Sequence, residues 1–269
     1  MNAQMDWHLA RALLEWQIEL GVTEALEVAP RDRLAAPVAP QPARAAEPAA
    51  APAAAPVAAA APEGQDHAQA IAEAGRAAQA ARDLEALAEA LAGFAHCDLR
   101  RGARNCVFAD GNPGARVMIV GEGPGADEDR LGRPFVGRAG QFLDQMLAAI
   151  GLSRESPDPA RAVYITNTVP WRPPGNREPT ADELAMLKPF LMRHIELAQP
   201  ELLVLVGNVA CDALLGRRGI LRLRGKWVEA QGLPALPMLH PAYLLRSPEA
   251  KRETWADLLS LQARLRALP

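Results

Sequence analysis

From residue 115 onward, short apolar runs alternate with longer stretches in which apolar residues recur every three or four positions. Short apolar runs are typical of buried strands, and the longer spacing is typical of helices that cover a sheet. The predicted strands are 116–120, 163–168, 202–206, 221–228 and 236–239, and the predicted helices are 140–150, 181–198, 208–215 and 249–268. This alternation predicts an α/β fold with a central parallel sheet, whose ligands bind at the carboxyl ends of the strands.

The first third of the chain has a different pattern. Residues 34–62 are almost entirely Ala and Pro, which offer too little apolar bulk to form a core. We therefore divide the chain into an amphipathic helix over 1–28, an extended Ala/Pro-rich linker over 29–66, a helical lead-in over 67–93 and a folded domain over 94–269. The linker is expected to be a spacer without a binding role of its own.

The predicted N-terminal helix carries two tryptophans, Trp7 and Trp16. Leaving both side chains in water would be unfavourable. The helix is therefore expected either to pack on the folded domain or to dock on a partner protein, and the sequence leaves both alternatives open.

Charge is distributed unevenly along the chain. The whole chain carries a net charge of −3, which by itself argues against strong attraction to nucleic acid. Residues 94–269 carry +4, however, and residues 1–93 carry −7, so the two parts must be interpreted separately. Arg outnumbers Lys, which suits contacts with phosphates or bases, although a GC-rich genome would produce the same bias.

Three cysteines cannot form a complete set of paired disulfides, and the N-terminus lacks the basic and then apolar pattern of a secretion signal. No run of about 18 uncharged apolar residues occurs, so no membrane span is expected. These features predict a cytoplasmic protein.

The end of the first predicted strand is rich in glycine. Gly121, Gly123 and Gly125 allow a backbone to approach a ligand closely, and the following helix start offers free N–H groups. Gly121, Gly123 and Ala126 also match the Gly-x-Gly-x-x-Ala pattern of dinucleotide-binding turns. That match is weak, because the carboxylates that follow it would repel a pyrophosphate.

Two further strand ends carry polar residues. Asn167 can present an amide donor and a carbonyl acceptor side by side, which is the pair needed to recognise a base edge. His240 is followed by a proline that fixes the loop, and Arg246 lies near enough to bind a phosphate. Taken alone, such an Asn is more often a loop cap and such a His is more often structural.

Six segments together resemble, in order and spacing, the motif series of the family 4 uracil-DNA glycosylases. They are residues 121–125, 132–137, 166–167, 172–177, 224–227 and 240–246, and the resemblance covers essentially residues 94–268. It implies a three-layer α/β uracil-DNA glycosylase fold, in which helices flank a central parallel sheet. It also implies cleavage of the N-glycosidic bond of deoxyuridine after the nucleotide has been flipped out of the DNA helix.

The resemblance assigns roles around the base. It implies that Phe135 stacks on uracil, that Asn167 reads its Watson–Crick edge, and that His240 donates to uracil O2 as negative charge develops there. Glu122 is placed near the attacking water, and Glu128 near uracil C5, where it would help to exclude thymine. The remaining substrate-binding residues are expected in the glycine-rich loop, and they are Gly121, Gly123, Pro124 and Gly125.

The resemblance also assigns contacts with DNA phosphates, which are independent of sequence, to Arg172, Asn176, Lys226 and Arg246. No motif places a Lys that could form a Schiff base, so a monofunctional enzyme is expected. A related group captures DNA covalently through a His in a loop near the first motif. Residues 136–140 contain no His, which disfavours covalent capture here.

One feature departs from the family. Its members normally hold a [4Fe–4S] cluster with four cysteines, and the corresponding positions here are Phe94, Cys97, Trp171 and about Met186. Only one ligand remains, whereas four thiolates are the usual requirement. We therefore predict no cofactor, and bulky apolar side chains in the space of the cluster. Cys106 cannot complete the set, and Cys211 is expected to be a small buried residue.

Three functions follow as hypotheses. The first is a monofunctional uracil-DNA glycosylase of base excision repair, expected as a monomer associated with the nucleoid. The second is a non-catalytic module that binds uracil or damaged DNA through the same pocket. The third is a dinucleotide-dependent enzyme, based on the weak glycine match. Under the first hypothesis, the N-terminal helix is a candidate for recruiting another repair or replication protein.

Overall fold

The computed structural model describes residues 63–268, so the predicted helix over 1–28 and nearly all of the predicted linker lie outside the described residues. The helices are α2 (Glu63–Ala80), α3 (Leu84–Gly93), α4 (Leu99–Gly102), α5 (Ala126–Leu131), α6 (Arg138–Ala148), α7 (Ala181–Ala198), α8 (Asn208–Leu215), α9 (Ile220–Leu223), α10 (Pro241–Arg246) and α11 (Lys251–Ala267). Two 3₁₀ helices are η1 (Pro174–Asn176) and η2 (Pro248–Ala250). None of the described helices is long and apolar enough to cross a membrane.

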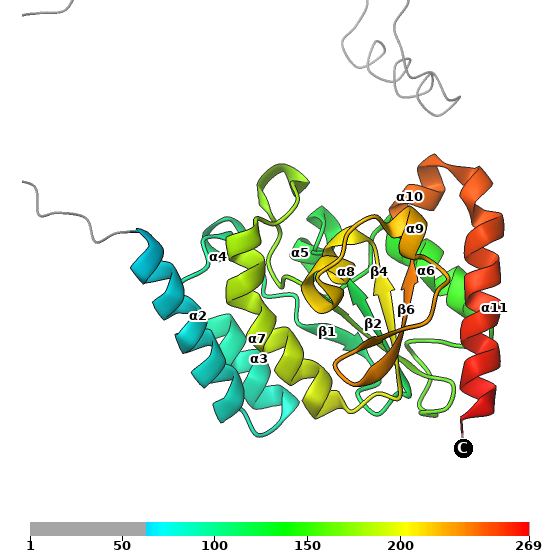
Figure 1. Ribbon diagram of the computed structural model, residues 1–269, viewed down its shortest axis with the longest axis horizontal. Helices are drawn as coiled ribbons and strands as arrows, with labels where there is room; N and C mark the ends of the chain where they lie inside the picture. The colour runs from blue at the N-terminus through cyan, green and yellow to red at the C-terminus, as the bar shows by residue number, and fades with distance from the viewer. Residues whose placement is uncertain (1–62, 269) are drawn as a thin grey trace, which may run out of the picture. The chain divides into compact units, whose positions relative to one another are not determined.

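The six described strands are β1 (Ala109–Gly111), β2 (Val117–Gly121), β3 (Val163–Asn167), β4 (Leu202–Val206), β5 (Val228–Ala230) and β6 (Leu233–Met238). They form one sheet in the order β1-β3-β2-β4-β6-β5 (Figure 1). The central strands β3, β2, β4 and β6 are parallel, and β1 and β5 pair antiparallel at the two edges. The predicted α/β fold with a central parallel sheet is confirmed. The short antiparallel edge strand β1 was not predicted.

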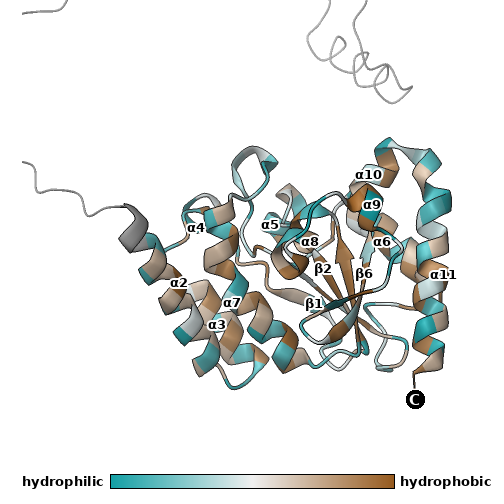
Figure 2. Cartoon of the chain, in the orientation of Figure 1, coloured by the Kyte–Doolittle hydropathy of each residue, from teal (hydrophilic) through white to brown (hydrophobic). Residues whose placement is uncertain are grey.

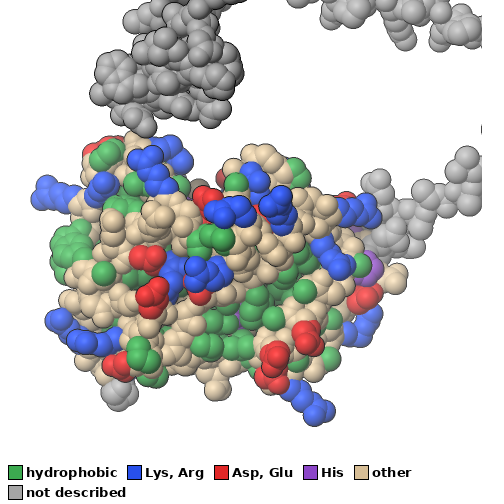
Figure 3. All heavy atoms as spheres, turned by 180° about the vertical axis from the view of Figure 1, so that it is seen from behind, with side chains coloured by type: hydrophobic (Ala, Val, Ile, Leu, Met, Phe, Trp, Pro, Cys, Tyr) green, Lys and Arg blue, Asp and Glu red, His purple; other side chains and the backbone are tan. Residues whose placement is uncertain are grey.

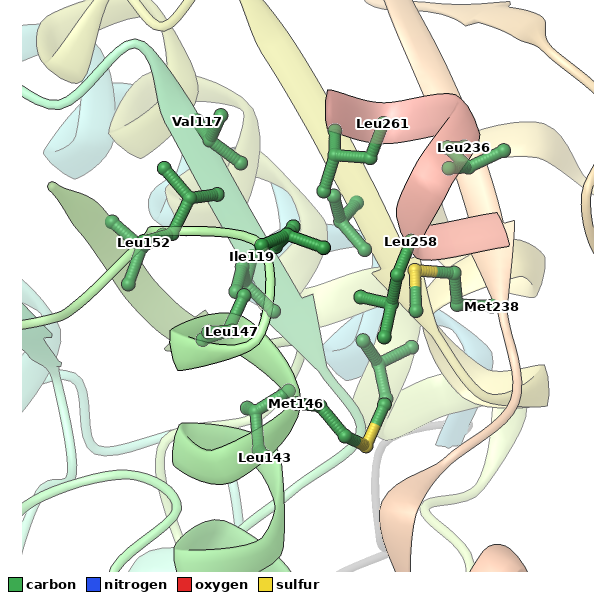
Figure 4. Close-up of a cluster of buried hydrophobic side chains, with 14 of the residues drawn as sticks. Val117, Ile119, Leu143, Met146, Leu147, Leu152, Leu236, Met238, Leu258 and Leu261 are labelled. Atoms are coloured by element: carbon green, nitrogen blue, oxygen red, sulfur yellow. The ribbon is translucent and has the colours of Figure 1, made fainter. Parts of the chain in front are cut away.

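The central strands β2, β3 and β4 are buried on both faces because helices cover both sides of the sheet. Successive strand residues point to opposite faces. In β2, Val117 and Ile119 therefore enter one buried cluster, whereas Met118 and Val120 enter another. Helices α6 and α11 complete the first cluster with residues that include Leu143, Leu147, Leu258 and Leu261 (Figure 4). Figure 2 shows the same division, with hydrophobic central strands between helices that carry hydrophilic residues on their outer sides.

A third buried cluster lies where α2 and α3 pack on α7. Helix α2 presents small residues at every fourth position, Ala70, Ala74 and Ala78, which lie on one face and let the helices approach closely. The helical lead-in predicted for 67–93 consists of two helices. They are separate because the Asp83 side chain caps α3 by accepting the N–H of Ala86 at 2.8 Å. Helix α2 begins at Glu63, inside the range predicted for the linker.

The predicted strand over 221–228 is wrong in its first half. Residues Ile220–Leu223 form helix α9, and strand β5 begins only at Val228. Gly219 and Gly225 flank the helix with left-handed backbone conformations, which interrupt an extended run. The alternating apolar residues looked like a strand because a single helical turn is too short to show its own period.

Candidate active site

The carboxyl ends of the parallel strands meet at one edge of the sheet and border a cavity of about 460 Å³. Ten of the predicted site residues line this cavity: Glu122, Gly123, Pro124, Gly125, Glu128, Phe135, Asn167, Asn176, His240 and Arg246. Three predicted residues, Gly121, Arg172 and Lys226, are not part of the lining. The structure therefore brings most of the predicted site together from segments that are far apart in the sequence.

Gly121 lies directly behind the cavity wall. The sheet register pairs it with Asn167 on the neighbouring strand. A Cβ atom at residue 121 would lie 2.4 Å from Asn167 Oδ1 and 2.5 Å from Cε2 of Phe135. Such distances are too short for any side chain, so glycine is what allows the Asn167 amide and the Phe135 ring to approach each other here.

Phe135 forms an aromatic wall of the cavity. Its ring is stacked on the ring of His240, with centroids 5.5 Å apart and planes inclined by 26°. Its backbone is left-handed, with φ of +53°, which is unfavourable for a bulky residue. This unusual conformation occurs where the resemblance expected the base to stack.

His240 is the N-cap of α10, and this position fixes the state of its ring. Its Nδ1 accepts the backbone N–H of Ala242 at 3.2 Å, so the proton of the neutral ring is on Nε2. Burial lowers the pKa of His240, the nearby Glu122 carboxylate raises it, and Arg246 lowers it again. The net pKa is below the ordinary value of a histidine. At neutral pH the side chain is thus an uncharged N–H donor.

The end of β4 supports Glu122. One carboxylate oxygen, Oε1, accepts the N–H of Val209 at 3.2 Å. Gly207, with φ of +95°, lies beneath the same carboxylate, and a Cβ there would be 2.3 Å from Oε1. The segment that follows strand β4, with Gly207 and the first turn of α8, therefore holds the Glu122 side chain in place at the cavity.

Glu128 joins two loops through its carboxylate. Its Oε2 accepts the N–H of Gly125 at 3.0 Å, and its Oε1 accepts the N–H groups of Val136 and Gly137 at 2.9 and 2.8 Å. These bonds connect the glycine-rich loop to the segment that follows Phe135. The position expected for Glu128 next to uracil C5 stays a prediction.

The rim of the cavity is partly basic. Arg172 lies behind the rim, and its Nε donates to Oδ1 of Asn176 at 2.7 Å, so it supports the loop that carries Asn176. Figure 3 shows Lys and Arg side chains along the upper edge of the molecule, where α5 and α10 lie in Figure 1. Lys226 is exposed between α9 and β5, outside the cavity lining, and its contact with DNA stays a prediction.

Several cavity residues were not predicted from the sequence: Ala139, Pro173, Arg177, Glu178, Pro179, Val209, Ala242 and Tyr243. Most of them are ordinary residue types next to predicted ones. Val209 could have been found, because it follows a predicted parallel strand whose carboxyl end must lie at the same edge. No unusual residue marked that strand end, so it received no role.

The positions expected for iron–sulfur ligands do lie together, in the third buried cluster. All four are at least nine-tenths buried, and they are Phe94, Cys97, Trp171 and Met186. Cys106 packs against the same cluster, and burial raises the pKa of the Cys97 and Cys106 thiols to about 11. Both thiols are therefore protonated at neutral pH. Within residues 63–268, no three His, Cys, Asp or Glu side chains are grouped so that they could hold a metal ion. These residues do not fit a cluster that needs four thiolates.

Comparison with known proteins adds an independent finding. A family model described as "Uracil DNA glycosylase superfamily" matches residues 108–259. Over 180 residues the chain is 38% identical to a type-4 uracil-DNA glycosylase of Thermotoga maritima, which covers 65% of this chain and 91% of that protein. It is 36% identical over 183 residues to a type-4 uracil-DNA glycosylase of Archaeoglobus fulgidus, with coverage of 65% and 89%. A type-5 uracil-DNA glycosylase of Pyrobaculum aerophilum is 35% identical over 162 residues, with coverage of 55% and 71%.

Proposed function

Because the chain belongs to the uracil-DNA glycosylase superfamily, we propose that it hydrolyses the N-glycosidic bond of deoxyuridine in DNA, as an enzyme of base excision repair. One observation carries this proposal. A neutral His240 is stacked on Phe135 in a cavity that Asn167 and Glu122 also line. These groups cannot reach a base inside a duplex, so the deoxyuridine nucleotide has to flip out of the helix before cleavage.

Recognition of the base is assigned to Phe135 and Asn167. The Phe135 ring provides an apolar face on which a flat base can stack. The Asn167 side chain is 7% exposed, so few water molecules compete for its amide and carbonyl groups. Uracil offers an N–H between two carbonyl groups, and a carboxamide can pair with an adjacent donor and acceptor of that edge.

His240 acts on the leaving group. As the glycosidic bond breaks, the departing uracil gains negative charge, and a donor aimed at O2 stabilises that charge. The N–H of Ala242 occupies Nδ1, so Nε2 carries the proton and can donate to the base. A neutral donor does not have to give up its proton, because stabilising the uracil anion is sufficient in a dissociative transition state.

Glu122 acts on the water and on the sugar. The N–H of Val209 binds Oε1 and orients the carboxylate, which leaves the other oxygen to accept a proton from a bound water. The negative charge of Glu122 also favours the positive charge that develops on the sugar. Water then attacks the anomeric carbon and gives one proton to Glu122. The released uracil anion takes up a proton from solvent, so the products are free uracil and an abasic site.

The cavity lining contains no lysine, so the proposal has no Schiff base and no cleavage of the backbone. Arg246 and Asn176 line the cavity, and Arg172 supports Asn176. We assign the contacts with DNA phosphates to these three residues and to Lys226. Such contacts depend on salt and not on DNA sequence.

We also propose that the protein works without an iron–sulfur cluster. The support is the donor set, since three of the four expected ligand positions hold Phe94, Trp171 and Met186. In this proposal their packing against α3 and α7 supports the loop after β3, which a cluster supports in other family members. No step of the reaction depends on a bound metal.

The remaining parts of the proposal concern the cell. We extend the proposal to a recruitment role for residues 1–28, a monomeric state and a location at the nucleoid, where genomic DNA is repaired. Co-purification of repair or replication proteins with the full chain, but not with residues 63–269, would support the recruitment role.

The test of the function uses a labelled oligonucleotide with one uracil, followed by alkali to break abasic sites. We expect cleavage at uracil and none at thymine, and loss of cleavage in Glu122→Ala and His240→Ala. Tight uracil-dependent binding without any cleavage would instead favour the alternative of a non-catalytic uracil-binding module. Arg116→Lys is the control, because Arg116 pairs with Glu201 at the amino ends of the central strands β2 and β4, away from the cavity.

A further inference from the structure

The backbone of Phe135 needs support from its surroundings. Its φ of +53° is a conformation that bulky residues rarely adopt, so the chain would relax if nothing held it. A change in this backbone would also move the ring, which is 6% exposed and stacked on His240. The position of the aromatic wall therefore depends on the groups that bind the main chain of Phe135.

Arg154 binds that main chain directly. Its Nη2 donates to the carbonyl oxygen of Phe135 at 2.9 Å, and its Nη1 donates to the carbonyl oxygen of Pro134 at 2.9 Å. The same guanidinium is anchored by two carboxylates, Asp144 at 2.8 Å and Asp110 at 3.0 Å. It thereby connects the Phe135 loop to helix α6 and to edge strand β1.

The Arg154 side chain is 9% exposed, so these bonds are shielded from water. A guanidinium is planar and presents its N–H groups as a rigid fork, which suits two successive carbonyl groups together with two carboxylates. An ammonium group keeps the charge but cannot reproduce that fork.

Gly140 leaves room for the same conformation. A Cβ atom at residue 140 would lie 1.8 Å from the carbonyl oxygen of Phe135, which is the oxygen that Arg154 binds. The first turn of α6 therefore packs directly against the peptide that the guanidinium binds. The backbone is held between these two groups.

We propose that Arg154 is a positioning residue for uracil excision: it holds Phe135 in its left-handed conformation and so sets the pose of the ring on which the base stacks. Arg154 does not line the cavity and has no contact with the base in this proposal. The inference rests on the proposed stacking role of Phe135, and the experiment separates the failure of one from the failure of the other.

The experiment measures single-turnover excision at saturating oligonucleotide, together with KM, for Arg154→Lys. Because a displacement of about 1 Å at a reacting centre can reduce a rate about 100-fold, we expect a loss of at least about tenfold in the single-turnover rate. DNA phosphates are bound elsewhere, so KM should change less than the rate. Arg116→Lys is the matched control, since it removes a comparable guanidinium fork from the pair with Glu201 at the amino ends of β2 and β4, away from the cavity.

A double-mutant cycle identifies the route of the effect. If Arg154 acts through the Phe135 ring, Arg154→Lys should have little further effect on a Phe135→Ala protein. An equal loss in both backgrounds would overturn the positioning role while leaving the stacking role intact. A Phe135→Ala protein as fast as the parent would remove the stacking role, and the inference with it.

A second variant keeps the test decisive if Arg154→Lys folds poorly. Asp144→Asn loosens the guanidinium without removing it, and Asp144 is half-exposed, so the fold should tolerate the change. It should reduce the single-turnover rate in the same direction by a smaller factor, and this reduction should also vanish in the Phe135→Ala background. An unchanged rate in Asp144→Asn, or a loss that persists in that background, would count against the positioning role.

Discussion

The cavity at the strand ends and the buried cluster around α2, α3 and α7 depart from the family pattern to very different degrees. The cavity is lined by Phe135, Asn167 and His240, the three residues that we propose to contact the base. In the buried cluster, three of four expected ligand positions hold Phe94, Trp171 and Met186 instead of cysteine. One region thus has the polar residues that the family pattern predicts, and the other has apolar side chains where that pattern predicts metal ligands.

The difference reflects what each region has to do. Excision needs particular donors and acceptors at particular distances, so a substitution in the cavity removes an interaction that nothing else supplies. Bracing a loop needs only a rigid contact, and packed apolar side chains can provide one. We therefore expect substitutions in the buried cluster to change the free energy of unfolding, and substitutions at the cavity to change the rate of uracil excision.

The largest effect is expected for Trp171→Ala. Trp171 is 2% exposed, and removal of a buried aromatic side chain reduces the free energy of unfolding by about 3–5 kcal/mol. Urea unfolding of the full chain measures this loss. Trp255→Ala is the control, because Trp255 is 43% exposed and its removal should change the free energy by less than about 1 kcal/mol.

The same variant also tests whether the buried cluster affects the rate of excision. Uracil excision by the folded fraction of Trp171→Ala should stay within about tenfold of the parent, since no base-contacting group is altered. A near-complete loss of excision with little loss of stability would mean that the buried cluster takes part in the chemistry.

Gly121→Ala should produce the next largest effect, on the rate. Its Cβ would overlap both Asn167 Oδ1 and the Phe135 ring, so the two groups that we propose to contact the base must move apart. A loss of about 100-fold in single-turnover excision is expected from misplaced groups of this kind. Gly75→Ala is the matched control, because nothing lies within 4 Å of its Cβ position and alanine favours the helix. Equal rates for the two variants would contradict the close packing behind the cavity wall.

A smaller effect is expected in the pH profile. Burial lowers the pKa of His240, so the ring stays neutral somewhat below the ordinary histidine pKa of about 6.5. Protonation at Nδ1 would also oppose the N–H of Ala242. The excision rate should therefore hold as the pH falls through about 6.5 and decline only below it, as the pH passes the lowered pKa of the folded protein.

Arg246 provides the matched change for this profile. Its positive charge lowers the pKa of His240, so Arg246→Gln should raise that pKa and move the acid decline to higher pH. The measurement is the single-turnover rate against pH for both proteins at constant ionic strength. A decline that moves to lower pH, or that lies above about 6.5 in the parent, would show that another group controls the profile.

Particular residues show why the sequence predicted some parts well and others poorly. The run 202–206 was predicted with its observed bounds, because five consecutive apolar residues between Pro200 and Gly207 are typical of a buried strand. The motifs predicted ten cavity residues, and most of these residues are in the segments that follow β2, β3 and β6, whose carboxyl ends meet at the cavity. Val209 and Arg154 were not predicted, since their roles arise from contacts between distant segments that no local pattern records. Helix α9 was mistaken for a strand because the glycines on either side, and the Asn208 side chain that accepts the N–H of Ile220, set its conformation.

The smallest effect is expected from removal of metal. If apolar packing has replaced a cluster, prolonged treatment with an iron chelator should leave uracil excision and the unfolding midpoint unchanged, because bound iron would otherwise contribute to folding. The Cys97 and Cys106 thiols, whose pKa values are raised to about 11, would have to lose their protons in an apolar environment before they could bind iron.

The control is a double variant, Cys97→Ser with Cys106→Ser, which removes both thiols near the third buried cluster. It should excise uracil at the parent rate. Iron that co-purifies in stoichiometric amount, together with loss of excision on chelation, would show that this region binds a metal despite its apolar residues.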